Sequence, residues 1–274
     1  MRIVDTHLHL VDMARFSYPW LADAGTLNRD WPADVYFAEA GKLGIEAALH
    51  MEVDVAEADM EAETRHMLGA HPGVVGAIAA CRPESTEFPA YLERMAALDG
   101  VKGFRRILHT SPDELSQRPI FAQNLRRLAA TGHPFDLGLL ARQLPIGLEL
   151  VTRCPDVQFV LNHCGVPDVA AKALDPWRRD IEALSERPNV AAKISGIVAY
   201  AGNDWTVDDL RPFVEHTIAC FGWDRVVFGS DYPVLTVTAD LTRWVTALKE
   251  IVAGASPDEQ ARLFHRNAER IYRI

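Results

Sequence analysis

The chain has 274 residues, of which 49% are hydrophobic and 24% charged, and its formal net charge is −10. Nucleic acid and anionic membranes both repel a negative surface, so we expect neither as a partner and expect a small-molecule ligand instead. No apolar run approaches the roughly 18 residues that a membrane span needs. No signal-peptide pattern precedes the first strand-like segment. These features predict a cytoplasmic protein.

Eight short apolar or β-branched segments alternate with longer amphipathic segments along the chain. The predicted strands are residues 2–7, 47–52, 74–80, 101–107, 134–140, 158–164, 190–196 and 225–231. The predicted helices are residues 32–44, 57–71, 89–100, 120–133, 144–154, 175–188, 206–222 and 242–254, with a further helix after Ser256 and Pro257. Strict alternation predicts a parallel sheet with right-handed crossovers. Closing eight such units gives an α/β fold, a TIM-like (β/α)8 barrel, as a single domain over residues 1–274.

A doubly wound open sheet is the main alternative fold. No Gly-x-Gly-x-x-Gly follows the first strand, so a dinucleotide site has no support. The long first connection, residues 11–34, is rich in aromatic residues. Long connections of this kind are often binding loops or lids. The other interpretation, that Tyr18, Trp20 and Trp31 only cover the rim of the barrel, stays open.

Ionisable and polar residues recur where the predicted strands end. They are His7, His9, Glu52, Arg105, Arg106, His163, Lys193, Ser195 and Asp231. In a (β/α)8 barrel the carboxyl ends of the strands build the active site. A polar group buried without a partner costs free energy, so a chance clustering at one end is unfavourable. The pattern therefore predicts an active site at this end.

His7 and His9 occupy alternate positions, so an ideal strand would place both on one face, with Asp5 below them. Alone, the pair is compatible with a metal clamp, a metal-free acid–base pair or simple packing. Combined with His163 and Asp231 at other strand ends, the pair indicates a common site near the barrel axis.

Asp231 follows an apolar strand and a Gly-Ser turn. Burial would raise the pKa of its carboxyl, and a nearby imidazolium or metal would lower it. Either environment suits a general base for water. The alternative is a helix N-cap, since Pro233 follows shortly. Arg105 and Arg106 point to opposite faces, so one of them can anchor a substrate carboxylate or an oxyanion.

Seven motifs together resemble the amidohydrolase superfamily. They are "DTHLHL", "YPWL", "KGFRR", "LNHCG", "KISG", "FGSDYPV" and "NAERIYRI". They are most similar to its amidohydrolase-related lactonase branch, with sugar-acid lactonases and 2-pyrone-4,6-dicarboxylate lactonases. The resemblance implies a distorted (β/α)8 barrel and hydrolysis of a lactone ester, a reaction of carbohydrate metabolism.

The resemblance also implies roles for individual residues. By position, His7, His9 and His163 polarise the lactone carbonyl and Asp231 activates water. Arg105 matches the family's substrate-binding arginine. Together with Trp20 and Lys193 it is expected to contact an anionic or polyhydroxylated lactone.

A metal centre is one of the alternatives that the resemblance raises. Many members use two metals bridged by a carbamylated lysine, but Lys102 lies too early in the fourth strand and Lys193 lies on the seventh. A binuclear centre is therefore not expected. His7, His9, His163 and Asp231 are suitable ligands for one Zn²⁺ or Mn²⁺. The sequence does not distinguish a site with one metal ion from a site without metal. It slightly favours a reaction that requires no metal.

Other functions remain compatible with the motifs. A metal-dependent decarboxylase of the same superfamily would use a similar residue set. A lactone isomerase would move an acyl group between hydroxyls without net hydrolysis. A non-catalytic binding protein fits poorly with so many ionisable strand ends. The identity of the lactone and the oligomeric state, monomer or homodimer, stay open.

Overall fold

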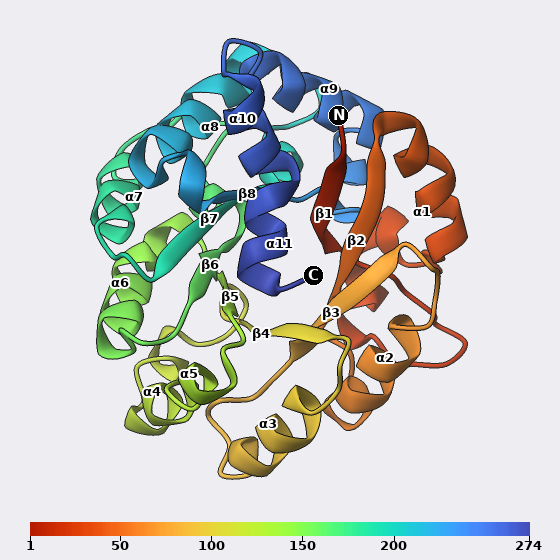
Figure 1. Ribbon diagram of the computed structural model, residues 1–274, viewed down its shortest axis with the longest axis vertical. Helices are drawn as coiled ribbons and strands as arrows, with labels where there is room; N and C mark the ends of the chain where they lie inside the picture. The colour runs from red at the N-terminus through yellow and green to blue at the C-terminus, as the bar shows by residue number, and fades with distance from the viewer.

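The computed structural model describes all 274 residues as eight parallel strands in sequential order with helices between them (Figure 1). The strands are β1 (Ile3–Leu8), β2 (Ile45–Met51), β3 (Val74–Ala80), β4 (Val101–Ile107), β5 (Phe135–Gly138), β6 (Phe159–Leu161), β7 (Val190–Ile194) and β8 (Val226–Phe228). The helices are α1 (Ala33–Ala40), α2 (Met60–Met67), α3 (Phe88–Ala96), α4 (Pro119–Leu125), α5 (Leu128–Thr131), α6 (Leu144–Arg153), α7 (Trp177–Ser185), α8 (Val207–Phe221), α9 (Leu241–Ile251), α10 (Pro257–Ala261) and α11 (Asn267–Tyr272). The predicted (β/α)8 barrel and its eight strands are confirmed.

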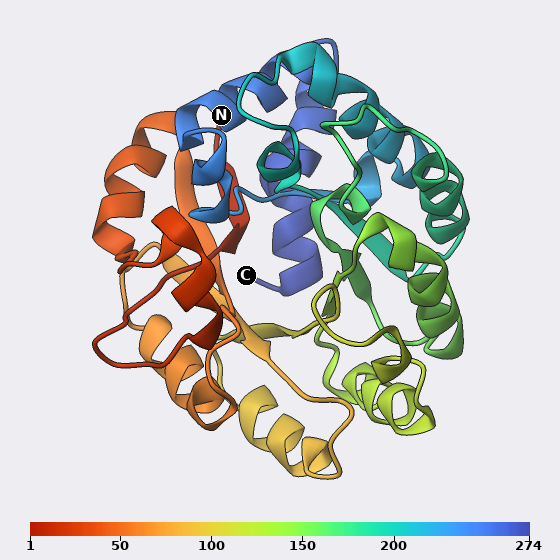
Figure 2. The same ribbon diagram turned by 180° about the vertical axis from the view of Figure 1, so that it is seen from behind.

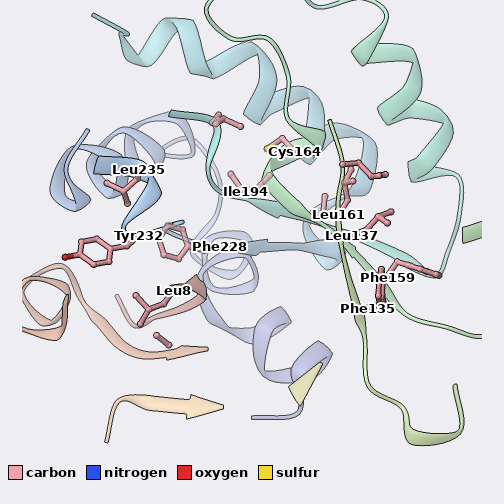
Figure 3. Packing of buried hydrophobic residues seen from close by; sticks show 14 of the residues in the cluster. Leu8, Phe135, Leu137, Phe159, Leu161, Cys164, Ile194, Phe228, Tyr232 and Leu235 are labelled. Atoms are coloured by element: carbon pink, nitrogen blue, oxygen red, sulfur yellow. The ribbon is translucent and has the colours of Figure 1, made fainter. Parts of the chain in front are cut away.

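The strands are almost wholly buried, because the helices cover their outer faces and apolar side chains fill the interior. Val4, Leu49, Val160 and Val227 belong to the interior cluster. A larger cluster lies between the sheet and the helices. It includes Phe135 on β5 and Phe159 on β6 (Figure 3), whose ring centroids are 5.9 Å apart.

None of the helices combines the length and apolar character that crossing a lipid bilayer requires.

The C-terminal helices close one end of the barrel. The hydroxyl of Ser256 accepts the backbone N–H of Glu259 and so caps α10, as the Ser-Pro pair predicts. The chain continues through a π-helical turn (Arg262–Arg266) into α11, which lies across the barrel end (Figure 1). Ile271 and Tyr272 of α11 join the interior cluster. Only the opposite end of the barrel is left for an open cavity.

The first connection lies on that opposite end (Figure 2). Two 3₁₀ turns, Pro19–Asp23 and Gly25–Leu27, give it local structure. Val11 and Trp31 join its two ends through backbone hydrogen bonds of 3.2 and 3.0 Å. The two ends of the connection are therefore held together by backbone pairing.

The barrel is sealed between β1 and the residues that follow β8. The N–H of Asp231 donates to the carbonyl of His7 over 2.9 Å, and the N–H of His9 donates to the carbonyl of Tyr232 over 2.7 Å. Leu8 and Tyr232 form a parallel bridge between these bonds. The strand ends that carry predicted site residues are therefore joined directly.

One predicted helix differs from the structure. Residues 120–133 form α4 and α5 rather than one helix, because the N–H groups of Arg127 and Ala130 bond three residues back, to Asn124 and Arg127. Such 3₁₀ bonds tighten the turn and end the α-helical ladder.

The aromatic layer of the core gives a stability prediction. Phe159→Ala should lower the free energy of unfolding by about 3–5 kcal/mol, because the fully buried ring would leave a cavity between β6 and its neighbours. Val75→Ala is the control: Val75 is 39% exposed on β3, and a change within about 0.5 kcal/mol is expected. Urea unfolding measures both, and equal effects would contradict this description of the core.

Candidate active site

A cavity of about 350 Å³ opens at the carboxyl ends of the strands. Its floor carries His9, Arg105, His163 and Asp231. Much of its wall is apolar and comes from the first connection. The wall residues of that connection are Val11, Trp20, Leu21, Leu27 and Trp31. The first connection therefore forms part of the cavity wall, whereas Tyr18 is buried outside the cavity.

Asp231 lies at the centre of the floor and is 3% exposed. One carboxylate oxygen, Oδ1, is 3.5 Å from Nε2 of His7, 3.5 Å from Nε2 of His9 and 3.9 Å from Nε2 of His163. The three histidines and the aspartate therefore meet at one point. The carboxylate caps no helix, since the following 3₁₀ turn has no side-chain cap.

Two effects act in opposite directions on the Asp231 carboxyl. Burial raises its pKa, and the neighbouring His163 and Arg105 counteract part of that rise. Its backbone has a positive φ of 62°. A non-glycine residue in this conformation is strained and is held there by its surroundings. Here the surroundings include the backbone bond to His7 that seals the barrel.

His9 and His163 line the cavity as neutral imidazoles. Burial, together with Arg105, lowers the pKa of His9 to about 3. Burial lowers the pKa of His163 to about 4, against the opposing effect of Asp231. Nδ1 of His9 donates to the carbonyl of Met51 over 3.0 Å. Nδ1 of His163 lies 2.9 Å from Oγ of Ser195.

Gly196 makes room for the His163 ring. A Cβ at this position would lie 2.2 Å from Nδ1 of His163 and 2.9 Å from Oδ2 of Asp231. Its φ of 65° is also one that glycine adopts without strain. The "KISG" motif therefore ends in glycine because the site occupies the space of a side chain.

His7 lies below the other histidines. It is fully buried and does not line the cavity, so the prediction that it polarises a substrate carbonyl directly does not match its position. Its pKa is lowered well below the usual value by burial, and Lys193 and His163 lower it further. His7 lies between Lys193 and Asp231, beneath the cavity rather than on its wall.

Asp5 does not lie below the two histidines as alternation predicts. The β1–β2 register shifts between Asp5 and Leu8, so one extra residue interrupts the alternation. The Asp5 carboxylate accepts the N–H groups of His7 and Ser230 and the hydroxyl of Tyr36 on α1, outside the sheet. It stabilises the β1–β8 seam.

The two arginines of β4 separate as predicted. Arg105 lines the cavity, but its charge is already paired: Nε donates to Oε1 of Glu52 over 2.5 Å, and Nη2 donates to the Glu52 carbonyl over 2.7 Å. Burial raises the pKa of the Glu52 carboxyl, but Arg105 and the N–H of Asp54 together lower it below its usual value. Arg106 points away from the axis and pairs with Glu84 over 2.9 Å.

Lys193 is not placed to contact a ligand, contrary to the prediction. It is fully buried beneath the floor and does not line the cavity. Its ammonium donates to Asp136 over 2.6 Å and to the Thr6 carbonyl over 2.8 Å. The apolar barrel interior favours this inward pairing, because a buried ammonium requires a partner.

Four further polar residues line the cavity. They are Asp54, His109, Thr110 and Tyr200. All lie just beyond strand ends, in connections whose path the strand pattern does not predict. Asp54 stands two residues after Glu52 and has a positive φ of 48°, and its N–H donates to Oε2 of Glu52 over 2.8 Å.

The profile of the amidohydrolase family matches residues 4–274. The chain belongs to the amidohydrolase family. This amidohydrolase is 31% identical to y4mH, an uncharacterized protein of Sinorhizobium fredii, over 99% of its length and 98% of that protein. It is 30% identical to an L-fucono-1,5-lactonase of Burkholderia multivorans, over 99% of its length and 96% of the lactonase.

The fold is shared with a solved amidohydrolase of Burkholderia multivorans that contains bound zinc. The TM-score is 0.90 over 100% of both chains, at 24% sequence identity. In the present amidohydrolase, one ligand atom each from His7, His163 and Asp231 lie within 4.8 Å of one another. These donor types can hold a divalent metal ion.

The charges beside these donors fit a metal poorly. A metal-bound imidazole usually donates its other N–H to an acceptor. The other ring nitrogen of His7, Nδ1, instead lies 3.3 Å from the Lys193 ammonium. Nη1 of the Arg105 guanidinium lies 3.4 Å from Nε2 of His7. The site thus has suitable ligand atoms, but a guanidinium lies on the side where His7 would bind a dication, and an ammonium takes the place of the usual acceptor at its other nitrogen.

The buried histidines predict a pH dependence of stability. The folded protein holds His9 and His163 neutral, with pKa values of about 3 and about 4. The unfolded chain protonates them near pH 6.5. The free energy of unfolding should therefore fall as the pH decreases from about 6.5 towards 4, by up to about 1.4 kcal/mol per pH unit for each histidine.

His163→Gln should reduce that slope, because it removes one of the groups that bind a proton in the unfolded chain but not in the folded protein. Urea unfolding at several pH values measures it. An unchanged slope in the variant would contradict the neutral state of His163.

Proposed function

We propose that this amidohydrolase hydrolyses the ester of a neutral, polyhydroxylated lactone, with Asp231 as the base that activates water. The observation that carries the proposal is the buried Asp231 carboxylate on the cavity floor, beside His9, His163 and Arg105. A carboxyl whose pKa is raised is a better proton acceptor than an exposed one. The 30% identity to an L-fucono-1,5-lactonase supports the reaction class.

The reaction begins with a water molecule between Asp231 and the lactone carbonyl. Asp231 takes a proton from this water, and the water oxygen forms a bond to the carbonyl carbon. Negative charge then develops on the carbonyl oxygen. The Nη1 group of Arg105, which is not bonded to Glu52, supplies a donor for that oxygen.

Collapse of the tetrahedral intermediate breaks the bond to the ring oxygen. Protonated Asp231 returns its proton to that leaving oxygen, so the base is regenerated and the product is an open hydroxy acid. His9 lines the floor with Nδ1 bonded to Met51, so its free Nε2 can accept a hydrogen bond from the water or from a lactone hydroxyl. No step requires a metal.

The charges on the cavity wall favour a neutral lactone over a dicarboxylate. Arg105 is the only lysine or arginine that lines the cavity, and Glu52 already balances it. Asp54 and Asp231 line the same cavity. The nearest arginine to the Asp54 carboxylate, Arg82, is 3.7 Å away. A second carboxylate on the substrate would therefore meet like charge, which is unfavourable.

Polar and aromatic groups on the wall suit a sugar-like ring. The indole N–H groups of Trp20 and Trp31 donate to backbone carbonyls, of Val53 and Leu27, so these residues offer only ring surface to a ligand. Asp54, Thr110 and Tyr200 supply hydrogen-bonding groups for hydroxyls. This combination matches a ring with an apolar face and a hydroxylated edge.

Asp231→Asn tests the base. We expect kcat for lactone hydrolysis to fall about 10²–10⁴-fold, because an amide cannot accept the proton from water. KM should change little. Asp204→Asn, at an exposed carboxylate outside the cavity, should leave both values unchanged. A pH-indicator assay measures the rates, and wild-type kcat in Asp231→Asn would refute the assignment.

A matched pair of lactones tests the substrate charge. An aldonic lactone and the aldaric lactone that differs only by a carboxylate in place of the terminal CH₂OH are compared by kcat/KM. We expect at least about a tenfold preference for the neutral lactone, which corresponds to about 1.4 kcal/mol. Asp54→Asn should narrow the preference, since it removes one wall charge. Equal rates, or faster turnover of the aldaric lactone, would contradict the proposed substrate.

A further inference from the structure

A row of buried ionisable groups runs from the barrel interior to the cavity floor. Asp136 on β5 contacts Lys193 on β7, Lys193 contacts His7 on β1, and His7 contacts Asp231 after β8. The distances are 2.6, 3.3 and 3.5 Å. All four residues are at most 3% exposed. The reaction described above uses only the last of them, so the role of the other three needs an explanation.

The surroundings of Lys193 keep its amine in the ammonium form. The Thr6 carbonyl and the Asp136 carboxylate can only accept, so each takes one proton of the Lys193 side chain. Asp136 in turn accepts from Tyr272 over 3.0 Å and from Asn162 over 2.7 Å. Burial lowers the pKa of Lys193, and contact with the Asp136 carboxylate opposes that effect. The third proton of the ammonium points to Nδ1 of His7.

The partners of the His7 ring determine where its single proton lies. Lys193 at Nδ1 and Arg105 at Nε2 are both cationic donors. The one carboxylate within 4.0 Å of the ring is Asp231, on the Nε2 side. Each ring nitrogen thus faces one cationic donor, but only Nε2 also has an acceptor nearby, the Asp231 carboxylate at 3.5 Å. A proton on Nδ1 would meet only the Lys193 ammonium, so the proton is more stable on Nε2.

We propose that Lys193 is a positioning residue that fixes His7 as the neutral Nε2–H tautomer, so that the ring donates towards Asp231 and orients that carboxylate as the base. This role rests on the proposed function for its catalytic consequence, but the tautomer itself is independent of any activity. His9 has the opposite tautomer, since its Nδ1–H donates to the Met51 carbonyl. The two histidines of the first motif therefore present one donor and one acceptor to the site.

The proposal distinguishes this site from one built around a metal. A metal ligand must offer a free nitrogen lone pair, and Nε2 of His7 would carry a proton instead. The charged and titratable groups around the His7 ring are Lys193 of β7, Arg105 of β4, His9 after β1, His163 after β6 and Asp231 after β8. Of these, only Lys193 is hydrogen-bonded to Nδ1.

Nitrogen NMR of histidine-labelled wild-type protein tests the tautomer directly. The resonances of His7 are assigned by their loss in His7→Gln. We expect a protonated Nε2 and an unprotonated Nδ1 that do not titrate between about pH 5 and pH 8. A proton on Nδ1, or an imidazolium in this range, would overturn the proposal whether or not the protein hydrolyses lactones.

Lys193→Met tests the cause. Without the ammonium, Nδ1 of His7 can bind a proton, so the His7 resonances should titrate as the pH falls. With a lactone that the wild type hydrolyses, kcat should fall about 10- to 100-fold. KM should be retained, because neither Lys193 nor His7 lines the cavity. The acid limb of the pH–rate profile should move to higher pH, because His7 would now take up a proton in this range and the imidazolium form would leave Asp231 a weaker base, with a lower rate.

Two further variants separate positioning from folding. Lys193→Met with Asp136→Asn removes both members of the buried pair, which limits the loss of stability that an unpaired carboxylate would cause. Lys102→Met, the same substitution in a half-buried lysine of β4 away from the cavity, should leave the NMR spectrum and the profile unchanged. A folded double variant with the wild-type His7 spectrum and pH profile would overturn the proposal.

Discussion

Two backbone hydrogen bonds between the ends of β1 and β8 hold both the barrel and its site together. One links the Asp231 N–H to the His7 carbonyl, and the other links the His9 N–H to the Tyr232 carbonyl. The contact that closes the eight-stranded sheet therefore also sets the separation of the base from two of its histidines. Asp5 supports this seam from outside, since its carboxylate accepts the N–H groups of His7 and Ser230. Fold and site depend on the same few bonds.

Buried charges beneath the floor occur in fixed pairs. Glu52 balances Arg105, and Asp136 balances Lys193, in a region that apolar side chains otherwise fill. Removing one member of such a pair costs about 3–5 kcal/mol, because the other charge stays buried. The pairs therefore resist rearrangement and keep the electrostatic field at Asp231 constant. That constancy is what a preorganised site requires, since the catalytic groups need not reorient as charge develops.

Much of this arrangement could be predicted from the sequence. The eight strands could be predicted because buried parallel strands are continuous apolar runs, and such runs alternate with amphipathic segments along the chain. The ionisable residues could be placed because they stand where these runs end. The convergence of His9, His163 and Asp231 followed from the barrel geometry. Asp5 could not be placed, because one extra residue in β1 interrupts the alternation that the prediction assumed.

The roles of Lys193 and Arg105 show a second limit of the sequence. Both stand at strand ends, and nothing in the chain marks that Asp136 and Glu52, distant in sequence, already neutralise them. Only the structure shows that the Lys193 side chain lies beneath the cavity floor. It also shows that Nη1 is the one nitrogen of the Arg105 guanidinium that is not bonded to Glu52. For the same reason the sequence left an anionic and a polyhydroxylated ligand equally open, whereas the paired charges of the cavity are the basis for proposing a neutral, polyhydroxylated one.

Metal-free hydrolysis by Asp231-activated water is tested most directly by turnover in oxygen-18-labelled water with metal-stripped protein. A neutral aldonic lactone serves as substrate, the metal content of the protein is measured, and the product is examined by mass spectrometry. We predict full activity without metal and one labelled oxygen, in the carboxylate of the product. Unlabelled product, as an isomerase would give, release of carbon dioxide, or activity that returns only when a divalent metal is added would contradict it.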